Sequence, residues 1–249
     1  RVFSNLIELR EGSNAGHAKR VADLARKVAV RLNFAPAEVQ DVMLAGLLHD
    51  IGKIGLPDDL LAKPVSHMTG DELGVMRKHP ITGQAALMGL ENMRGAATLI
   101  RSHHERWDGT GYPRGLKFEQ IGMAAEIAGI ADSFCAMQRD KPYRSALGHQ
   151  EALEELHGLR GRMFNPALME QFVQCVGLYP IGTLLELSTG EVGVVIQQNR
   201  VQRSRPRVVV MLDGDKQPVR NYRVVDLREP AHASLRVSRA LPYNAYGLR

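Results

Sequence analysis

HDIGK at residues 49–53 and HHERWDGTGYP at residues 103–113 are the two stretches that decide how this chain folds and what it can bind. Each stretch begins with two adjacent side chains of the kind that ligate metals. Neighbouring residues on a helix point about 100° apart, so a His-Asp or His-His pair grips a single ion poorly from one side. Such pairs suit two ions side by side, with the carboxylate as a bridge. The two stretches therefore predict a multinuclear metal site of the type that hydrolyses phosphate esters.

Helical periodicity adds three further ligand-type residues. His17 begins an apolar stripe, His79 follows a helix that starts at the capping box Thr69–Glu72, and Asp132 ends the apolar face of the segment 121–132. A lone histidine on such a face is more often a hydrogen-bonded core residue. The whole set is harder to explain by packing, because buried polar groups need partners. A shared metal centre would satisfy all of its members: His17, His49, Asp50, His79, His103, His104 and Asp132.

The chain outside these motifs predicts a mainly α fold with a small β-rich appendage. Residues 1–10 read as the end of an N-terminal linker helix, 11–178 as the catalytic domain, 179–230 as a β-rich subdomain and 231–249 as an irregular tail. The β-rich runs are Thr183–Leu187, Val192–Gln197 and Val208–Leu212, separated by turn sequences. Pro36 and Asn165-Pro166 are typical helix starts.

Composition narrows the class of protein. No stretch approaches the roughly 20 apolar residues needed to span a membrane, and Cys135 and Cys175 do not make a disulfide framework. We therefore expect a cytoplasmic protein that does not insert into membranes. The formal net charge is +5, and the basic excess lies after residue 200, around short strand-like runs with few aromatic residues. A nucleic-acid groove would need interleaved aromatics, so we do not expect a nucleic-acid partner.

Four residues are candidates for handling a substrate beside such a centre. Gly52 and Gly55 flank Lys53 and allow the backbone to turn its amine back towards the metals. Tyr112, in the glycine-rich loop after His103-His104, offers a ring face on which a base can stack. Lys141 and Arg144 follow Asp132 closely and are candidate phosphate contacts. Each candidate also has an alternative without a functional role: Lys53 as a surface lysine, the loop of Tyr112 as a turn-rich loop, and Lys141 and Arg144 as an ordinary helix end.

These residues resemble the HD-GYP family, a branch of the HD-domain phosphohydrolases. The resemblance rests on HDIGK at 49–53, HHERWDGTGYP at 103–113, His17, His79, the Ala-Asp at 131–132 and KPYR at 141–144, and it covers roughly residues 10–180. It implies an HD-type helical bundle, a centre of two or three iron or manganese ions, and hydrolysis of the bacterial messenger cyclic di-GMP. The ligand set carries over onto the seven residues above, and the phosphate contacts onto Lys53, Lys141 and Arg144.

The chain departs from the family pattern at three positions. Ser13 stands where some members have a Glu that helps to hold a third metal, so we expect two divalent ions and linear pGpG as the product, with further conversion to GMP left open. Cys135 stands where an Asp is usual, and Glu126 where an Arg is common. Residues around a metal's ligands orient them and tune the metal, so these two changes bear on activity.

The resulting hypothesis is metal-dependent hydrolysis of cyclic di-GMP in bacterial signalling. We expect Asp50 to bridge the ions and Lys53 to offset charge on the phosphate, as the two catalytic residues. One ion would take His17, His49 and Asp132, and the other His79, His103 and His104. Iron or manganese is favoured, with zinc, cobalt and nickel as alternatives. Two other functions stay open: a catalytically weak or inactive receptor that binds cyclic di-GMP or a protein partner through the GYP loop (residues 107–117), and another HD-type nucleotide phosphohydrolase. A homodimer is also left open.

Overall fold

The computed structural model describes residues 16–140, 145–199, 201–242 and 245–248, and the chain divides into two compact units. The helical unit comprises the residues up to Leu147 together with Glu155–Cys175, and the β unit comprises Gly148–Glu154 and the residues from Val176 onward. The sequence placed this boundary at 178. Residues 148–154 belong to the β unit, where the half-buried His149 has its Nε2 3.0 Å from the Gly177 carbonyl oxygen.

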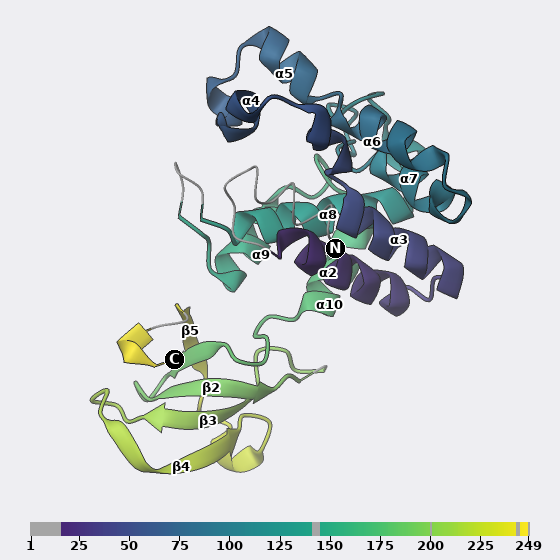
Figure 1. The fold of residues 1–249 in the computed structure, drawn as a ribbon. Coiled ribbons are helices and arrows are strands. Elements are labelled where there is room, and N and C mark those ends of the chain that lie inside the picture. Colours follow the sequence, from purple (N-terminus) through teal and green to yellow (C-terminus); the bar gives the residue numbers. More distant parts are fainter. Residues whose placement is uncertain (1–15, 141–144, 200, 243–244, 249) are drawn as a thin grey trace. The chain divides into compact units, whose positions relative to one another are not determined.

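The helical unit is built around α2, α3, α7 and α8, which pack on one another (Figure 1). Its α-helices and 3₁₀ turns, with α9 continuing from the β unit, are α2 (His17–Arg31), α3 (Pro36–Leu48), η1 (Ile51–Gly55), α4 (Asp58–Ala62), η2 (Val65–His67), α5 (Gly70–Met76), α6 (His79–Met88), η3 (Glu91–Met93), α7 (Arg94–Ile100), η4 (Phe118–Gln120), α8 (Met123–Met137), α9 (His149–Gly158) and α10 (Pro166–Val176). None of the described helices is long and apolar enough to cross a lipid bilayer.

The helix boundaries that the sequence marks are confirmed. Pro36 is the first residue of α3 and Pro166 the first of α10, where the Asn165 side chain accepts a hydrogen bond from the Ala167 N–H at 2.9 Å. Thr69 and Glu72 form the expected capping box at the start of α5. These local signals set where the three helices begin.

Two glycines allow the close packing of these elements. A Cβ on Gly46 would lie 3.0 Å from the Ala22 backbone, so α3 can approach α2 only because this residue has no side chain. Gly52, in η1, lies against the start of α6. A Cβ there would collide with the His79 carbonyl oxygen and would lie 2.6 Å from the Gly83 nitrogen. The HDIGK stretch is therefore pressed against the helix that begins at His79.

Replacing Gly52 by alanine tests this contact. Both colliding atoms belong to backbone and cannot rotate away, so we expect Gly52→Ala to lower the free energy of unfolding by about 1–3 kcal/mol or more. Gly55→Ala is the matched control, because no atom lies within 4 Å of its added Cβ. Urea denaturation of both variants makes the comparison. Equal stability of the two would show that the contact at Gly52 is not tight.

The β unit is one antiparallel sheet in the order β4-β3-β2-β1-β5. Its strands are β1 (Leu184–Leu187), β2 (Val192–Gln197), β3 (Arg207–Leu212), β4 (Pro218–Asp226) and β5 (Val237–Leu241). Alternate residues pack into one core with Tyr179, and this cluster contains Leu185, Leu187, Val195, Val208, Val210, Val225 and Leu227. The mainly α fold with a β-rich appendage is thus confirmed.

Two strands were not predicted. β4 is an edge strand whose residues from Arg220 to Val224 are exposed, so its hydrophobic alternation is weak. β5 corrects the expectation of an irregular tail over 231–249. It pairs with β1, about 50 residues earlier in the chain, and this long-range pairing rather than its own short pattern makes it a strand.

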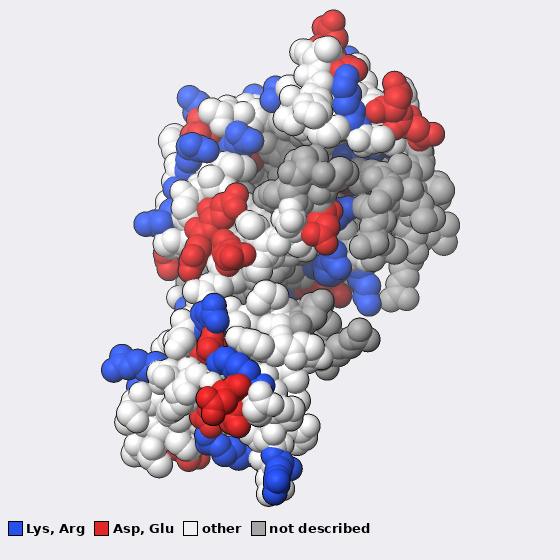
Figure 2. Space-filling view, turned by 90° about the vertical axis from the view of Figure 1, so that its left-hand side faces the viewer, with Lys and Arg blue, Asp and Glu red and all other residues white. Residues whose placement is uncertain are grey.

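Some of the basic side chains of this part of the chain are paired with acidic ones. Glu186 pairs with Lys216 and Arg239, and Glu191 pairs with Arg223. Figure 2 shows basic and acidic side chains interleaved on the visible face of this unit. The charges on that face therefore form a mixed, solvated surface rather than a continuous basic stripe.

Candidate metal centre

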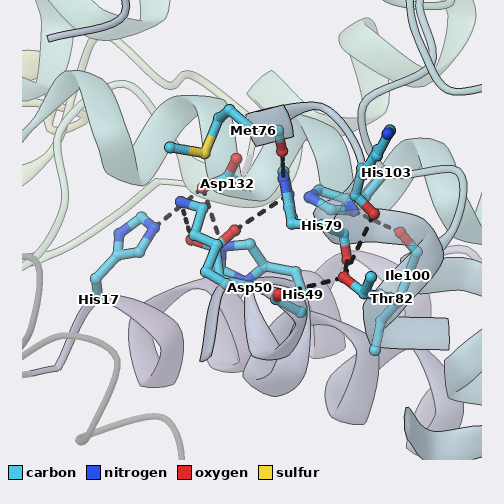
Figure 3. A network of polar contacts seen from close by, with 12 residues as sticks. His17, His49, Asp50, Met76, His79, Thr82, Ile100, His103 and Asp132 are labelled. Carbon is cyan, nitrogen blue, oxygen red and sulfur yellow. Dashed lines mark hydrogen bonds and ion pairs between the residues drawn. The ribbon is translucent and has the colours of Figure 1, made fainter. Parts of the chain in front are cut away.

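Three histidines enter the site in the same way, each after a helix. His49 caps α3, His79 follows α5, and His103 follows α7. Each Nδ1 lies within hydrogen-bond distance of the carbonyl oxygen three residues earlier: 2.9 Å to Gly46, 2.8 Å to Met76 and 2.6 Å to Ile100. Figure 3 shows the contacts of His79 with Met76 and of His103 with Ile100. A carbonyl only accepts, so Nδ1 carries a proton and Nε2 is the nitrogen left for a metal ion. The helix ends thus fix three imidazoles with Nε2 turned inward.

Two carboxylates lie among these rings. Asp50 directs its two oxygens to different histidines, with Oδ1 3.4 Å from His79 Nε2 and Oδ2 3.4 Å from His49 Nε2. Asp132, on α8, has its Oδ1 3.0 Å from His17 Nε2 and 3.5 Å from His49 Nε2. Five segments that are distant in sequence therefore meet at one polar cluster inside the helical unit.

The cluster divides into two ligand groups. In each, one ligand atom from every residue lies within 4.8 Å of the others. The first group is His17, His49 and Asp132, and the second is Asp50, His79, His103 and His104. The structure thus brings together all seven residues that the sequence nominates, and Asp50 reaches towards both groups.

The buried nitrogens show that the cluster fits metal ions. Within the described residues, Nε2 of His49, His79 and His103 is buried and has no hydrogen-bond partner. A buried polar atom without a partner costs about 1–3 kcal/mol. Divalent ions such as iron, manganese, zinc or cobalt accept mixed imidazole and carboxylate ligands and would supply the partners. The types of ligand residue and the unpaired buried nitrogens therefore both fit divalent metal ions.

The electrostatics favour neutral imidazoles in the second group. Burial, aided by neighbouring histidines, lowers the pKa of His103 to about 3 and the pKa of His104 well below its usual value. Burial likewise lowers the pKa of His79 to about 4. At His49 burial acts in the same direction, but Asp50 and Asp132 outweigh it and raise the pKa to about 9. Neutral imidazole is the form that binds metal, so an ion bound at His49 would displace its second proton.

Lys53 lies at the edge of the second group. The 3₁₀ turn η1 carries it, and its Nζ lies 2.7 Å from Asp50 Oδ2. Burial alone would raise the pKa of Asp50, but Lys53 and His49 outweigh it and hold that pKa well below its usual range. Lys141, Arg144 and Ser13 lie outside the described residues.

Tyr112 closes one side of the second group. Its ring stacks on the His104 ring, with centroids 4.8 Å apart and 30° between the planes, and its N–H donates to the His104 carbonyl at 3.2 Å. Gly111 allows this return of the chain, because a Cβ there would lie 2.5 Å from the His104 carbonyl oxygen. The GYP loop therefore folds back onto the histidine pair that precedes it.

Glu105 holds this loop, and the sequence analysis missed it. Its buried carboxylate accepts hydrogen bonds from the N–H of Arg114 at 2.8 Å and of Leu116 at 2.9 Å, one at each oxygen. The signal in the sequence was an acidic residue directly after two ligand histidines, where a buried carboxylate needs donors. Glu105 thereby ties the GYP loop to the segment that carries His103 and His104.

Glu105→Gln is expected to loosen the GYP loop. A glutamine has one carbonyl oxygen, so one of the two N–H groups loses an acceptor worth about 1.5–3 kcal/mol. We predict hydrogen exchange at Arg114 or Leu116 that is about 10-fold faster or more, measured by NMR, with the metal content retained. The exposed Glu119→Gln is the matched control. Unchanged protection at both amides would contradict the assigned role of Glu105.

The two unusual residues on α8 contact different neighbours. Burial, then the nearby Asp132 carboxylate, raises the pKa of the Cys135 thiol to about 12, so Cys135 is a neutral group one turn after that ligand. Glu126 is buried and hydrogen-bonds with Asn165, which precedes α10. The unusual Glu126 therefore affects the packing of α8 near α10.

Glu126 makes stability depend on pH. Burial raises the pKa of Glu126 from 4.5 to about 7. Between these two pH values the folded state keeps a proton that the unfolded state has lost. Stability therefore falls as pH rises from 4.5 to about 7, by on the order of 1–3 kcal/mol. We expect Glu126→Gln to remove this fall and to be the more stable protein at pH 8, by thermal or urea unfolding. If its profile parallels that of the exposed control Glu155→Gln, the assignment is wrong.

Each of the two units matches a known domain family. The sequence profile of the HD domain matches residues 1–168, and that of the KOW domain associated with the HD domain matches residues 184–243. A Pseudomonas aeruginosa protein named as a cyclic di-GMP phosphodiesterase is 36% identical over 226 residues, which cover 90% of this chain and 54% of that protein. A Vibrio cholerae 3′3′-cGAMP-specific phosphodiesterase is 32% identical over 174 residues, with 69% and 33% covered.

A solved structure supports the fold. The Vibrio cholerae cyclic GMP-AMP-specific phosphodiesterase superposes with a TM-score of 0.56 at 22% identity, covering 70% of this chain and 47% of that one. The chain spans about half the length of the first of these curated relatives. The match to the Pseudomonas protein covers 90% of this chain and therefore includes parts of both units.

Proposed function

Because this chain belongs to the HD domain family, and to its HD-GYP branch, we propose that it is a metal-dependent phosphodiesterase that hydrolyses cyclic di-GMP to linear pGpG. One observation carries the proposal: buried, unpaired Nε2 atoms in two ligand groups that meet at Asp50. Relatives named as cyclic di-GMP phosphodiesterases support the substrate. We place the reaction in the bacterial cytoplasm, which agrees with two free cysteines.

The residues divide the work as follows. His17, His49 and Asp132 would hold one ion and His79, His103 and His104 the other, with Asp50 between them. Two such ions, iron or manganese by the family resemblance, supply an activated water and polarise the phosphodiester. The Lys53 amine, held by Asp50, would offset the charge that builds on the phosphoryl oxygens. Tyr112 and its loop form the wall against which the nucleotide rests.

A second substrate has specific support. Relatives named as 3′3′-cGAMP-specific phosphodiesterases are 30–33% identical to this chain. Cyclic di-GMP and 3′3′-cGAMP share the phosphodiester ring and differ in one base. The ligand groups act on the shared part, so the base preference is set by other contacts.

Product analysis tests the proposal. Protein purified without oxygen is loaded with Fe(II) or Mn(II) and given cyclic di-GMP, 3′3′-cGAMP or pGpG, and the products are separated by chromatography. We expect pGpG to accumulate from cyclic di-GMP, and Asp50→Asn to reduce turnover by at least about 100-fold. Faster cleavage of cGAMP would overturn the substrate assignment. No turnover by protein shown to hold two ions would overturn the enzymatic function and support the receptor alternative.

A further inference from the structure

Arg77 stands at the metal centre without belonging to either ligand group. It caps the C-terminal end of α5, and its guanidinium carbon lies over the Tyr112 ring, 5.3 Å from the centroid. That ring in turn stacks on His104. A single aromatic ring therefore separates an exposed cation from a member of the second ligand group.

The guanidinium is available to a ligand. In the part of the chain that the structure describes, the Arg77 side chain makes no ion pair and no hydrogen bond. Its contact with Tyr112 is with the face of the ring. Nearby cations are engaged: Lys53 with Asp50 at 2.7 Å, and Arg114 with Ser102 at 2.8 Å. Stacking on a ring leaves the edge of a guanidinium open, so its fork of N–H donors can still meet a phosphate.

The proposed substrate carries a second negative charge that neither ligand group would neutralise. A cyclic dinucleotide contains two phosphodiesters, each with one negative charge, separated by a single ribose. Lys53 and the residues that would hold the two ions would act on the one that is cleaved. The other must stay close by, because the ring holds it there, and its desolvation is unfavourable unless a cation meets it.

We propose that Arg77 binds the phosphate of the cyclic dinucleotide that is not being hydrolysed. The assignment rests on the proposed function and names a further substrate-binding residue for it. The contact with Tyr112 fixes the guanidinium before the substrate arrives, so little side-chain freedom is lost on binding. Arg77 thereby selects substrates that carry a second phosphodiester.

The test compares two substrates and three variants. Cyclic di-GMP has a second phosphate, whereas bis(p-nitrophenyl) phosphate has a single phosphodiester. We expect Arg77→Ala to raise KM for cyclic di-GMP about 10-fold or more, with kinetics on bis(p-nitrophenyl) phosphate within about 2-fold of wild type. Arg77→Lys should recover part of the loss. Lys78→Ala is the matched control, an exposed cation next in sequence, and should match wild type.

Each contrary result separates the two proposals. An unchanged KM in Arg77→Ala, with wild type active, overturns the role of Arg77 and leaves the phosphodiesterase intact. Equal losses on both substrates would mean that Arg77 only positions Tyr112, which also overturns it. If wild type hydrolyses bis(p-nitrophenyl) phosphate but not cyclic di-GMP, the substrate assignment fails. In that case, calorimetry measures the binding of cyclic di-GMP to wild type and to Arg77→Ala. Equal Kd values for the two proteins, or no binding to wild type, would overturn the role of Arg77.

Discussion

The site depends on how three imidazoles satisfy one nitrogen and leave the other without a partner. His49, His79 and His103 each give their Nδ1 proton to a carbonyl at a helix end, so the backbone fixes the ring and its tautomer. The opposite nitrogens then lie buried beside two carboxylates. That arrangement is unfavourable for the protein without metal ions, and metal binding would relieve it. The fold therefore holds the ligand residues in place at a cost in the free energy of folding.

The surrounding structure can be understood as support for that arrangement. Gly52 lets the HDIGK turn press against the start of α6, which fixes Asp50 relative to His79. Glu105 ties the GYP loop to the second histidine pair. The loop then places Tyr112 on His104, and Tyr112 carries Arg77 above it. These contacts therefore link the ligand residues to the surface at Tyr112 and Arg77, where we propose that the substrate binds.

The sequence predicted the parts that depend on local pattern. The adjacent ligand pairs are readable within a few residues. So are the helix starts at Pro36 and Thr69 and the apolar stripes that contain His17 and Asp132. Glu105 and Arg77 were missed because their roles come from contacts 9 to 35 residues away in the chain. β5 was missed for the same reason, since its partner β1 is distant in sequence. Long-range contacts of this kind leave little trace in local composition.

Counting the bound ions tests the central claim most directly. Native mass spectrometry of protein loaded with Mn(II) without oxygen should show two ions per chain. Asp132→Asn should retain one, because the group of Asp50, His79, His103 and His104 does not use that residue. A single ion in wild type, or the same number in both proteins, would contradict a centre built from two ligand groups.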